Sequence, residues 1–174
     1  MSFFGASARH YGLLIALMAG VVPMRDVRAE DMPYFADRIL VIKSERVLEL
    51  LHDGVVLKSY PIALGSHPDG PKYRKGDGRT PEGVYLIDRR STKTAYRLEL
   101  HVSYPNADDR ARARAAGDKP GGGIFVHGMP RRFGQNDPVR FFRDWTDGCI
   151  AVGNIAIEEI GDMVVDGTPI EIRP

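Results

Sequence analysis

Short apolar runs separated by turn residues are the feature that most limits the folds open to this chain of 174 residues. Three such runs lie close together near the start: Ile39–Ile42, Arg46–Leu51 and Val55–Leu57. Asp53-Gly54 separates the last two, and an Asp-Gly pair between apolar runs is a strong signal for a β-hairpin. The segment therefore predicts antiparallel strands.

The remainder of the chain continues the β pattern and adds two helices. Asn106, with Asp109 three positions later, predicts the start of a short helix that runs to Ala116. Asn154 predicts the cap of a second helix, whose apolar positions are Ile157, Ile160 and Val164. The expected fold is mostly β with two short helices. Its further strands are expected at Gly83–Ile87, Tyr96–Val102, Ile124–Val126, Cys149–Val152 and Pro169–Ile172.

The N-terminus has the three parts of a secretory signal peptide. A weakly basic start precedes the apolar run Gly12–Met24, and Val27-Arg28-Ala29 resembles a small-x-small cleavage site. The run is shorter than the roughly 20 residues that span a bilayer. We expect residues 1–29 to be a signal peptide, residues 30–174 to be one exported, periplasmic domain, and no membrane span to remain after cleavage. An uncleaved anchor is the alternative.

Charge and composition exclude several classes of function. The formal net charge is +1, so no nucleic-acid partner is expected. The histidines His52, His67, His101 and His127 lack the spacing of metal ligands, which predicts that no metal is bound. Gly121–Gly123 is too short and wrongly placed for a nucleotide loop, and no cofactor is expected.

The single cysteine, Cys149, is the strongest candidate for chemistry. One cysteine cannot form an internal disulfide, and an exported chain without a structural disulfide leaves the thiol to be explained by function. His127 ends an apolar strand, and a histidine beside a thiol can take its proton and later return it to a leaving amine. These residues predict a cysteine nucleophile, Cys149, with His127 as general base and acid.

The residues around this pair carry a resemblance. His127-Gly128, a long loop, and then Thr146-x-Gly148-Cys149-Ile150-x-Val152-x-Asn154 together resemble the signature of the L,D-transpeptidase catalytic domain family of the YkuD type. Thr80–Tyr85 is similar to that family's Thr-Pro-x-Gly-x-Tyr/Phe segment. The similarity extends from about Arg38 to Pro174.

The resemblance implies both a fold and a reaction. The fold is β-sandwich-like, with the cysteine and histidine in a groove under a mobile loop. The substrates are stem peptides of peptidoglycan, in which the thiolate attacks the carbonyl between a diamino acid and D-Ala. The acyl group then passes to an amine of a second stem peptide, to a lysine of an envelope protein, or to water.

The resemblance also assigns supporting roles. Gly148, Cys149 and Asp147 are implied as backbone donors of an oxyanion hole, and Thr146 as support for the turn. Two departures concern the substrate: Asp147 stands where the family often has His, and Ala151 where it usually has Arg. Loop arginines are candidates to replace that cation, because guanidinium groups match carboxylate geometry; they are Arg131, Arg132, Arg140 and Arg143. Trp145 and His101 are two further groove candidates. The alternative for Trp145 is a packing residue.

Three functions remain open at this point. The leading hypothesis is a cysteine-dependent L,D-transpeptidase that cross-links the cell wall or anchors proteins to it. Asp147 and Ala151 motivate the second, an L,D-carboxypeptidase or a peptidoglycan–protein amidase on the same scaffold. The third is a wall-binding module that has kept the fold without catalysis.

Overall fold

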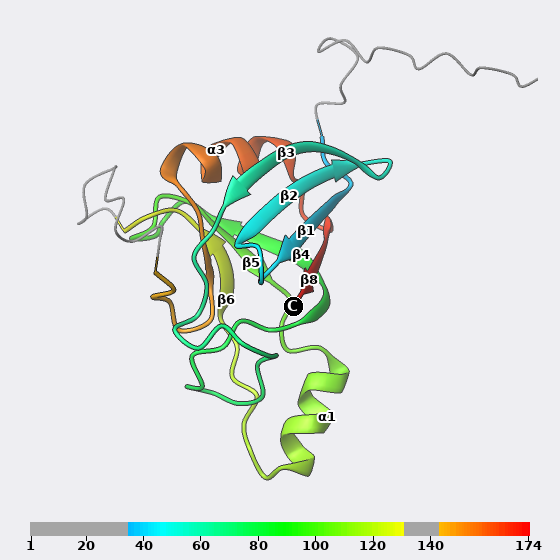
Figure 1. The fold of residues 1–174 in the computed structure, drawn as a ribbon, viewed down its shortest axis with the longest axis vertical. Coiled ribbons are helices and arrows are strands. Elements are labelled where there is room, and N and C mark those ends of the chain that lie inside the picture. Colours follow the sequence, from blue (N-terminus) through cyan, green and yellow to red (C-terminus); the bar gives the residue numbers. More distant parts are fainter. Residues whose placement is uncertain (1–34, 131–142) are drawn as a thin grey trace, which may run out of the picture. The chain divides into compact units, whose positions relative to one another are not determined.

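One curled sheet organises the part of the chain that the computed structural model describes, residues 35–130 and 143–174 (Figure 1). Eight strands are hydrogen-bonded in the order β3-β2-β1-β8-β4-β5-β6-β7. Within the described residues the prediction of a mostly β fold with two short helices is confirmed. The bounds are β1 Arg38–Ile42, β2 Val47–His52, β3 Val55–Pro61, β4 Gly83–Ser91, β5 Glu99–Val102, α1 Ala107–Ala115, β6 Ile124–His127, β7 Ile150–Ala151, α3 Asn154–Met163 and β8 Pro169–Arg173.

The β2–β3 hairpin forms at the position that Asp53-Gly54 predicts. Asp53 has a φ of 48° and Gly54 a φ of 77°, which are the left-handed conformations of a two-residue hairpin turn. His52 pairs with Val55 across this turn, and the two strands are antiparallel. The local sequence signal and the observed turn therefore agree.

Strand β4 belongs to both halves of the sheet and bends it. Gly83 to Leu86 pair with β8, whereas Ile87 to Ser91 pair with β5. The register shifts between Ile87 and Arg89, and irregularities of this kind bend a strand and increase its twist. The two halves consequently share one hydrophobic core, whose fully buried larger members include Ile39, Leu48, Leu50, Ile87, Leu100, Ile124, Ile150, Ile157 and Ile160.

The C-terminal strand β8 is inserted in the middle of the sheet. It runs parallel to β1, where Ile39 pairs with Ile170, and antiparallel to β4, where Tyr85 also pairs with Ile170. Ile170 and Ile172 are buried. The short apolar run of this segment predicts a strand. It does not predict that β1 and β4, which are distant in the sequence, are the strands that pair with it.

Helix α1 begins as its sequence predicts. Asn106 accepts hydrogen bonds from the backbone N–H groups of Asp108 and Asp109, and the Asp109 carboxylate accepts one from the Asn106 N–H. This capping box satisfies donors that the first turn would otherwise leave open. Asp109 is buried and also accepts a hydrogen bond from the Tyr85 hydroxyl, which ties the helix to β4.

Helix α3 corrects one expectation. Its N-cap is Gly153, not Asn154, and no side chain caps it. The Asn154 side chain turns instead to the chain after β6 and accepts the Met129 N–H at 2.9 Å. No helix in the described residues has the length and apolarity needed to cross a membrane.

Candidate active site

His127, at the end of β6, and Cys149, directly before β7, lie on the same face of the sheet. β6 and β7 are parallel, with Val126 opposite Ile150 and His127 opposite Ala151. Val126 and Ile150 are fully buried in the core, and side chains alternate between faces along a strand. His127 therefore points to the other face, and Cys149, one residue before Ile150, belongs to that same face. The register thus places the two residues that the sequence selects on one face of the sheet.

The Cys149 thiol lies against the chain that leads into β6. Its Sγ lies 3.6 Å from the carbonyl oxygen of Gly123, in donor geometry. Burial raises the pKa of this thiol to about 11, an effect that a backbone hydrogen bond from Phe125 opposes in part. The nearby carboxylates of Glu99 and Asp147 also contribute to this raised value. The resting residue is consequently a neutral thiol, and it needs a base to become a nucleophile.

The His127 ring has the properties of such a base. Its Nδ1 lies 2.7 Å from the Gly128 carbonyl oxygen, and because a carbonyl only accepts, Nδ1 carries the proton. Nε2 is thereby left as the acceptor. Burial lowers the pKa of His127, while the hydrogen bond to Gly128 and the charge of Glu99 oppose that shift. The imidazole is therefore neutral at pH 7 and can accept a proton.

Two aromatic side chains hold the His127 ring in place. The Tyr96 ring centroid lies 4.4 Å from that of His127, and the Trp145 ring meets it edge-on at 5.9 Å. His127 is only 4% exposed as a result. Trp145 thus packs on the catalytic candidate, which agrees with its interpretation as a packing residue.

A hydroxyl group organises the turn that carries Cys149. Thr146 Oγ1 donates to the Cys149 carbonyl oxygen at 2.7 Å and accepts the Gly148 N–H at 3.1 Å. Since this N–H is occupied, Gly148 supports the turn and does not offer a donor to an oxyanion. Its φ is 128°, and a Cβ there would lie 2.5 Å from the Arg79 carbonyl oxygen, so only glycine fits. The backbone N–H of Cys149 is the remaining candidate donor on this turn beside that of Asp147.

Two other loop segments, around Gly65 and Thr80, support this turn. Thr80 is fully buried, and its Oγ1 accepts the Gly65 N–H at 3.1 Å. Gly65 forms an isolated β-bridge with Thr146, and a Cβ on Gly65 would lie 3.1 Å from the Gly148 Cα. The Thr80-Pro81-Glu82-Gly83 segment of the resemblance therefore acts through Gly65. Only that motif, and no local pattern, could have indicated its place next to the cysteine.

Asp144 fixes the chain just before the turn and was missed from the sequence. Its carboxylate pairs with the Arg46 guanidinium, at 2.8 Å from Nη2 to Oδ2, and also accepts the Leu64 N–H at 2.8 Å. Arg46 follows β1 in the chain and carries a φ of 54°. An acid so far from its arginine in sequence gives no signal before the fold is known.

The remaining groove candidates divide into two groups. Arg131, Arg132 and Arg140 lie outside the described residues, and Arg143 is exposed. His101 pairs with Phe125 across β5 and β6, which places it on the face of Cys149, but its Nδ1 lies 2.6 Å from the Asp88 carboxylate. His101 is thus already engaged by the Asp88 carboxylate. Asp147 is exposed beside the turn.

One set of close metal-binding atoms occurs among the described residues, and it belongs to another part of the fold. Asp37, His52 and Asp53 lie together beside the β2–β3 hairpin. Next to Cys149 the charged neighbours include Glu99 and Asp147, which raise the pKa of the thiol, and Lys72, which lowers it. The thiol and the imidazole are the two kinds of group, nucleophile and base, that attack on a carbonyl group requires.

A protein-family model matches most of the chain. Residues 36–172 match the family model of the L,D-transpeptidase catalytic domain, YkuD. YafK of Escherichia coli (strain K12) is 33% identical over 132 residues, which cover 72% of this chain and 46% of YafK. The chain therefore spans about half the length of this curated relative.

Solved structures give the same picture. The helical cell shape determining protein Pgp2 from Campylobacter jejuni superimposes with a TM-score of 0.59 at 26% identity, over 77% of this chain and 46% of Pgp2. Bd1075 of Bdellovibrio bacteriovorus gives 0.55 at 27% identity, over 79% of this chain and 48% of Bd1075. An L,D-transpeptidase from Mycobacterium smegmatis shares the fold, with a TM-score of 0.53 at 17% identity, over 78% of this chain and 58% of that one.

Proposed function

Because this chain belongs to the L,D-transpeptidase catalytic domain family, we propose that it is a cysteine acyltransferase acting on stem peptides of peptidoglycan. The observation that carries the proposal is the placement of Cys149 and His127 on one face of the paired strands β6 and β7. The family's wall chemistry further supports an exported, periplasmic protein with residues 1–29 as its signal peptide, a segment that lies outside the described residues.

In the proposed first step His127 Nε2 takes the proton of the Cys149 thiol. The thiolate sulfur bonds to the carbonyl carbon between the diamino acid and D-Ala, and the carbonyl π electrons move to oxygen. The Cys149 N–H, with that of Asp147, stabilises this oxyanion; one such donor typically contributes about 3 to 4 kcal/mol. The C–N bond then breaks, and His127 gives the proton to the departing amine of D-Ala. D-Ala is released, and the rest of the substrate remains attached to Cys149 as a thioester.

In the second step an acceptor attacks the thioester. An amine of a second stem peptide, or of a lysine on an envelope protein, loses a proton to His127 as its nitrogen bonds to the acyl carbon. The Cys149 sulfur leaves and regains the proton from the imidazolium. The first acceptor gives a cross-link between peptides, and the second gives an anchored protein.

Hydrolysis is the second candidate, and one observation favours it. Ala151 is buried opposite His127 and exchanges two backbone hydrogen bonds with Ala63, so no cation projects from this position. Water then captures the acyl group, which gives an L,D-carboxypeptidase or releases a wall-linked protein. Loss of the arginine that the family usually has at this place removes one means of holding an acceptor peptide.

Product analysis by mass spectrometry separates these functions. The purified chain is incubated with a disaccharide-tetrapeptide, beside Cys149→Ala, His127→Ala and the matched control His52→Ala. A dimer linked between two diamino acids, lost in the first two variants only, supports transfer. Tripeptide with free D-Ala and no dimer supports the carboxypeptidase. Unchanged substrate in the wild type, with a wall-linked lysine peptide also left intact, would contradict catalysis and favour a binding module.

A further inference from the structure

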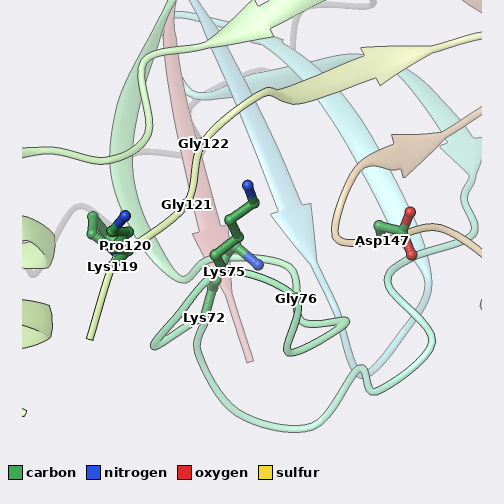
Figure 2. A pocket seen from close by; sticks show the side chains of 8 residues that line it. All are labelled: Lys72, Lys75, Gly76, Lys119, Pro120, Gly121, Gly122 and Asp147. Carbon is green, nitrogen blue, oxygen red and sulfur yellow. The ribbon is translucent and has the colours of Figure 1, made fainter. Parts of the chain in front are cut away.

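A basic cavity opens beside the cysteine turn, and the mechanism above does not use it. Its volume is about 820 Å³. Figure 2 shows Lys119 and Asp147 at opposite sides of it in this view, with Lys72 and Lys75 between them. Its lining residues are Lys72, Lys75, Gly76, Lys119, Pro120, Gly121, Gly122 and Asp147.

The chain that forms one wall of the cavity continues to the Cys149 thiol. Gly121 and Gly122 line the cavity, and the next residue, Gly123, supplies the carbonyl oxygen that faces Sγ at 3.6 Å. Asp147, on the other side, lies two residues before Cys149. The Lys72 charge also reaches the thiol, where it lowers the pKa. The cavity is thus lined by residues that precede Gly123 and Cys149 in the chain by only one or two positions.

One of the three lysines is neutralised and structural. Lys72 is 3% exposed and pairs with the Asp77 carboxylate at 2.7 Å. Burial would raise the pKa of Asp77, but hydrogen bonds from the Arg74 N–H, Lys72 and the Tyr73 N–H outweigh burial and hold this pKa at about 2. The loop that carries Lys75 is thereby folded around a charged carboxylate, so Lys75 projects from an ordered support.

The other two lysines, Lys75 and Lys119, line the same cavity and are exposed to solvent. The Lys75 N–H donates to the Lys119 carbonyl oxygen at 2.8 Å, which holds the two residues side by side. Among the ion pairs of the described residues, none includes Lys75 or Lys119. An anion that enters the cavity can therefore interact with two ammonium groups that no ion pair engages.

The bare backbone of the glycines keeps the cavity open. A Cβ on Gly121 would lie 3.1 Å from the Lys75 Cα, so this chain passes too close to the lysine loop for a side chain. Gly122 differs, because a Cβ there would meet only the Pro105 ring at 3.8 Å and the Tyr104 carbonyl oxygen at 3.9 Å. A small side chain at Gly122 is therefore compatible with the fold, because it would make only ordinary van der Waals contacts.

We propose that Lys75 and Lys119 form a carboxylate-binding subsite that holds a carboxylate of the peptide substrate beside Cys149. The assignment rests on the proposed function for the identity of the substrate, but binding to the subsite does not require turnover. A carboxylate fits the cavity because it accepts hydrogen bonds from two ammonium groups at once. The exposed Asp147 at the far side repels that carboxylate and so directs it toward the lysines.

Calorimetric titration of the Cys149→Ala chain, which cannot be acylated, tests the subsite directly. The ligand is the free tetrapeptide, compared with tetrapeptides amidated at one carboxyl group at a time, which identifies the carboxyl that binds. We expect the double change Lys75→Ala with Lys119→Ala to weaken binding about tenfold. The charge-preserving changes to Arg should retain most of the affinity, and Lys58→Ala, on the distant strand β3, should leave it unaltered.

The variants and the amidated peptides together decide the outcome. The subsite is supported if amidation of one carboxyl group weakens binding to the protein that keeps both lysines. That loss should be about as large as the loss that the double alanine change causes with the free peptide. Equal affinity for all peptides, or a double variant that binds like Lys58→Ala, would overturn the subsite. If lysine-dependent binding persists while the wild type shows no turnover, the subsite stands and the proposed acyl transfer fails.

Discussion

The Asn154 side chain accepts a hydrogen bond from the Met129 backbone N–H, at 2.9 Å between Oδ1 and N. This contact joins the first residue of α3 to the chain that leaves β6, two residues after His127. A Cβ on Gly128 would lie 2.7 Å from the same oxygen, so Gly128 is the residue that permits the approach. Asn154 therefore positions the carbonyl of Gly128, which in turn fixes the tautomer of His127.

Asn154→Ala should lower the acylation rate more than its cost in stability explains. Loss of one buried acceptor costs about 1 to 3 kcal/mol, and the His127 ring loses a defined partner. Asn106→Ala is the matched control, because it removes the cap of α1 at a cost of about 1 kcal/mol and has no contact with His127. Urea unfolding and single-turnover acylation are measured on both. Equal rates for the two variants would contradict the positioning role.

Gly148→Ala should unfold or strongly destabilise the Cys149 turn. The new methyl would lie 2.5 Å from the Arg79 carbonyl oxygen, at a φ of 128°. We expect a loss of about 3 kcal/mol or more, because steric overlap adds to backbone strain. Gly117→Ala has a φ of 73° but open space around it, and it should lose only about 1 to 2 kcal/mol. Similar unfolding free energies for both variants would refute the close approach.

Thr146→Val removes a hydroxyl and keeps the shape of the side chain. It deletes the bonds to the Cys149 carbonyl and the Gly148 N–H, at about 1 kcal/mol each, and frees the turn that orients the thiol. We expect kcat to fall at least tenfold. Thr168→Val, which loses a bond from the Val165 N–H at 3.3 Å, is a control for stability alone. A kcat unchanged in Thr146→Val would mean that the turn keeps its geometry without the hydroxyl.

The pH dependence of acylation follows from His127. Burial lowers the pKa of this imidazole, so the neutral base persists below the ordinary value of 6.5. As the pH falls, the rate should therefore remain on its plateau through pH 6.5 and decline only further down. The measurement is kcat/KM for a tetrapeptide between pH 4.5 and 8. A decline centred above pH 6.5 would contradict the assignment.

The reactivity of the free thiol provides a separate pH test. The pKa of Cys149 is raised to about 11, so only a small fraction is thiolate near neutrality. Alkylation by iodoacetamide without substrate should be slow at pH 7 and rise about tenfold per pH unit up to pH 9. Fast, pH-independent alkylation would reveal a stable thiolate–imidazolium pair in the resting protein.

The sequence predicts those parts of the fold that depend on neighbours in the chain. The Asp53-Gly54 hairpin and the Asn106 cap are confirmed because their signals are local and each has one low-energy solution. Asn154 was expected to act in the same way, as a cap. Its side-chain oxygen instead accepts a hydrogen bond from the Met129 N–H, and Gly153 is the N-cap of the helix. A donor so distant in the sequence cannot be found from the residues around Asn154.

In the candidate site too, the sequence predicts some residues and not others. Cys149 and His127 stand out because a lone cysteine and a strand-end histidine have a recognisable chemical pairing, and β6–β7 pairing places them on one face. Their supports could not be read in that way. Thr80 acts through Gly65, and Asp144 through Arg46, over separations that only the closed sheet defines.

Trapping the acyl-enzyme tests the central claim most directly. The purified chain is mixed with tetrapeptide, quenched in acid within the first turnover, and measured by intact-protein and peptide mass spectrometry. The account predicts one added acyl group, equal in mass to the substrate less D-Ala, on the peptide that contains Cys149. It also predicts that Cys149→Ala carries no adduct and His127→Ala forms it far more slowly. Substrate consumed with Cys149 unmodified, or an adduct that persists in Cys149→Ala, would contradict it.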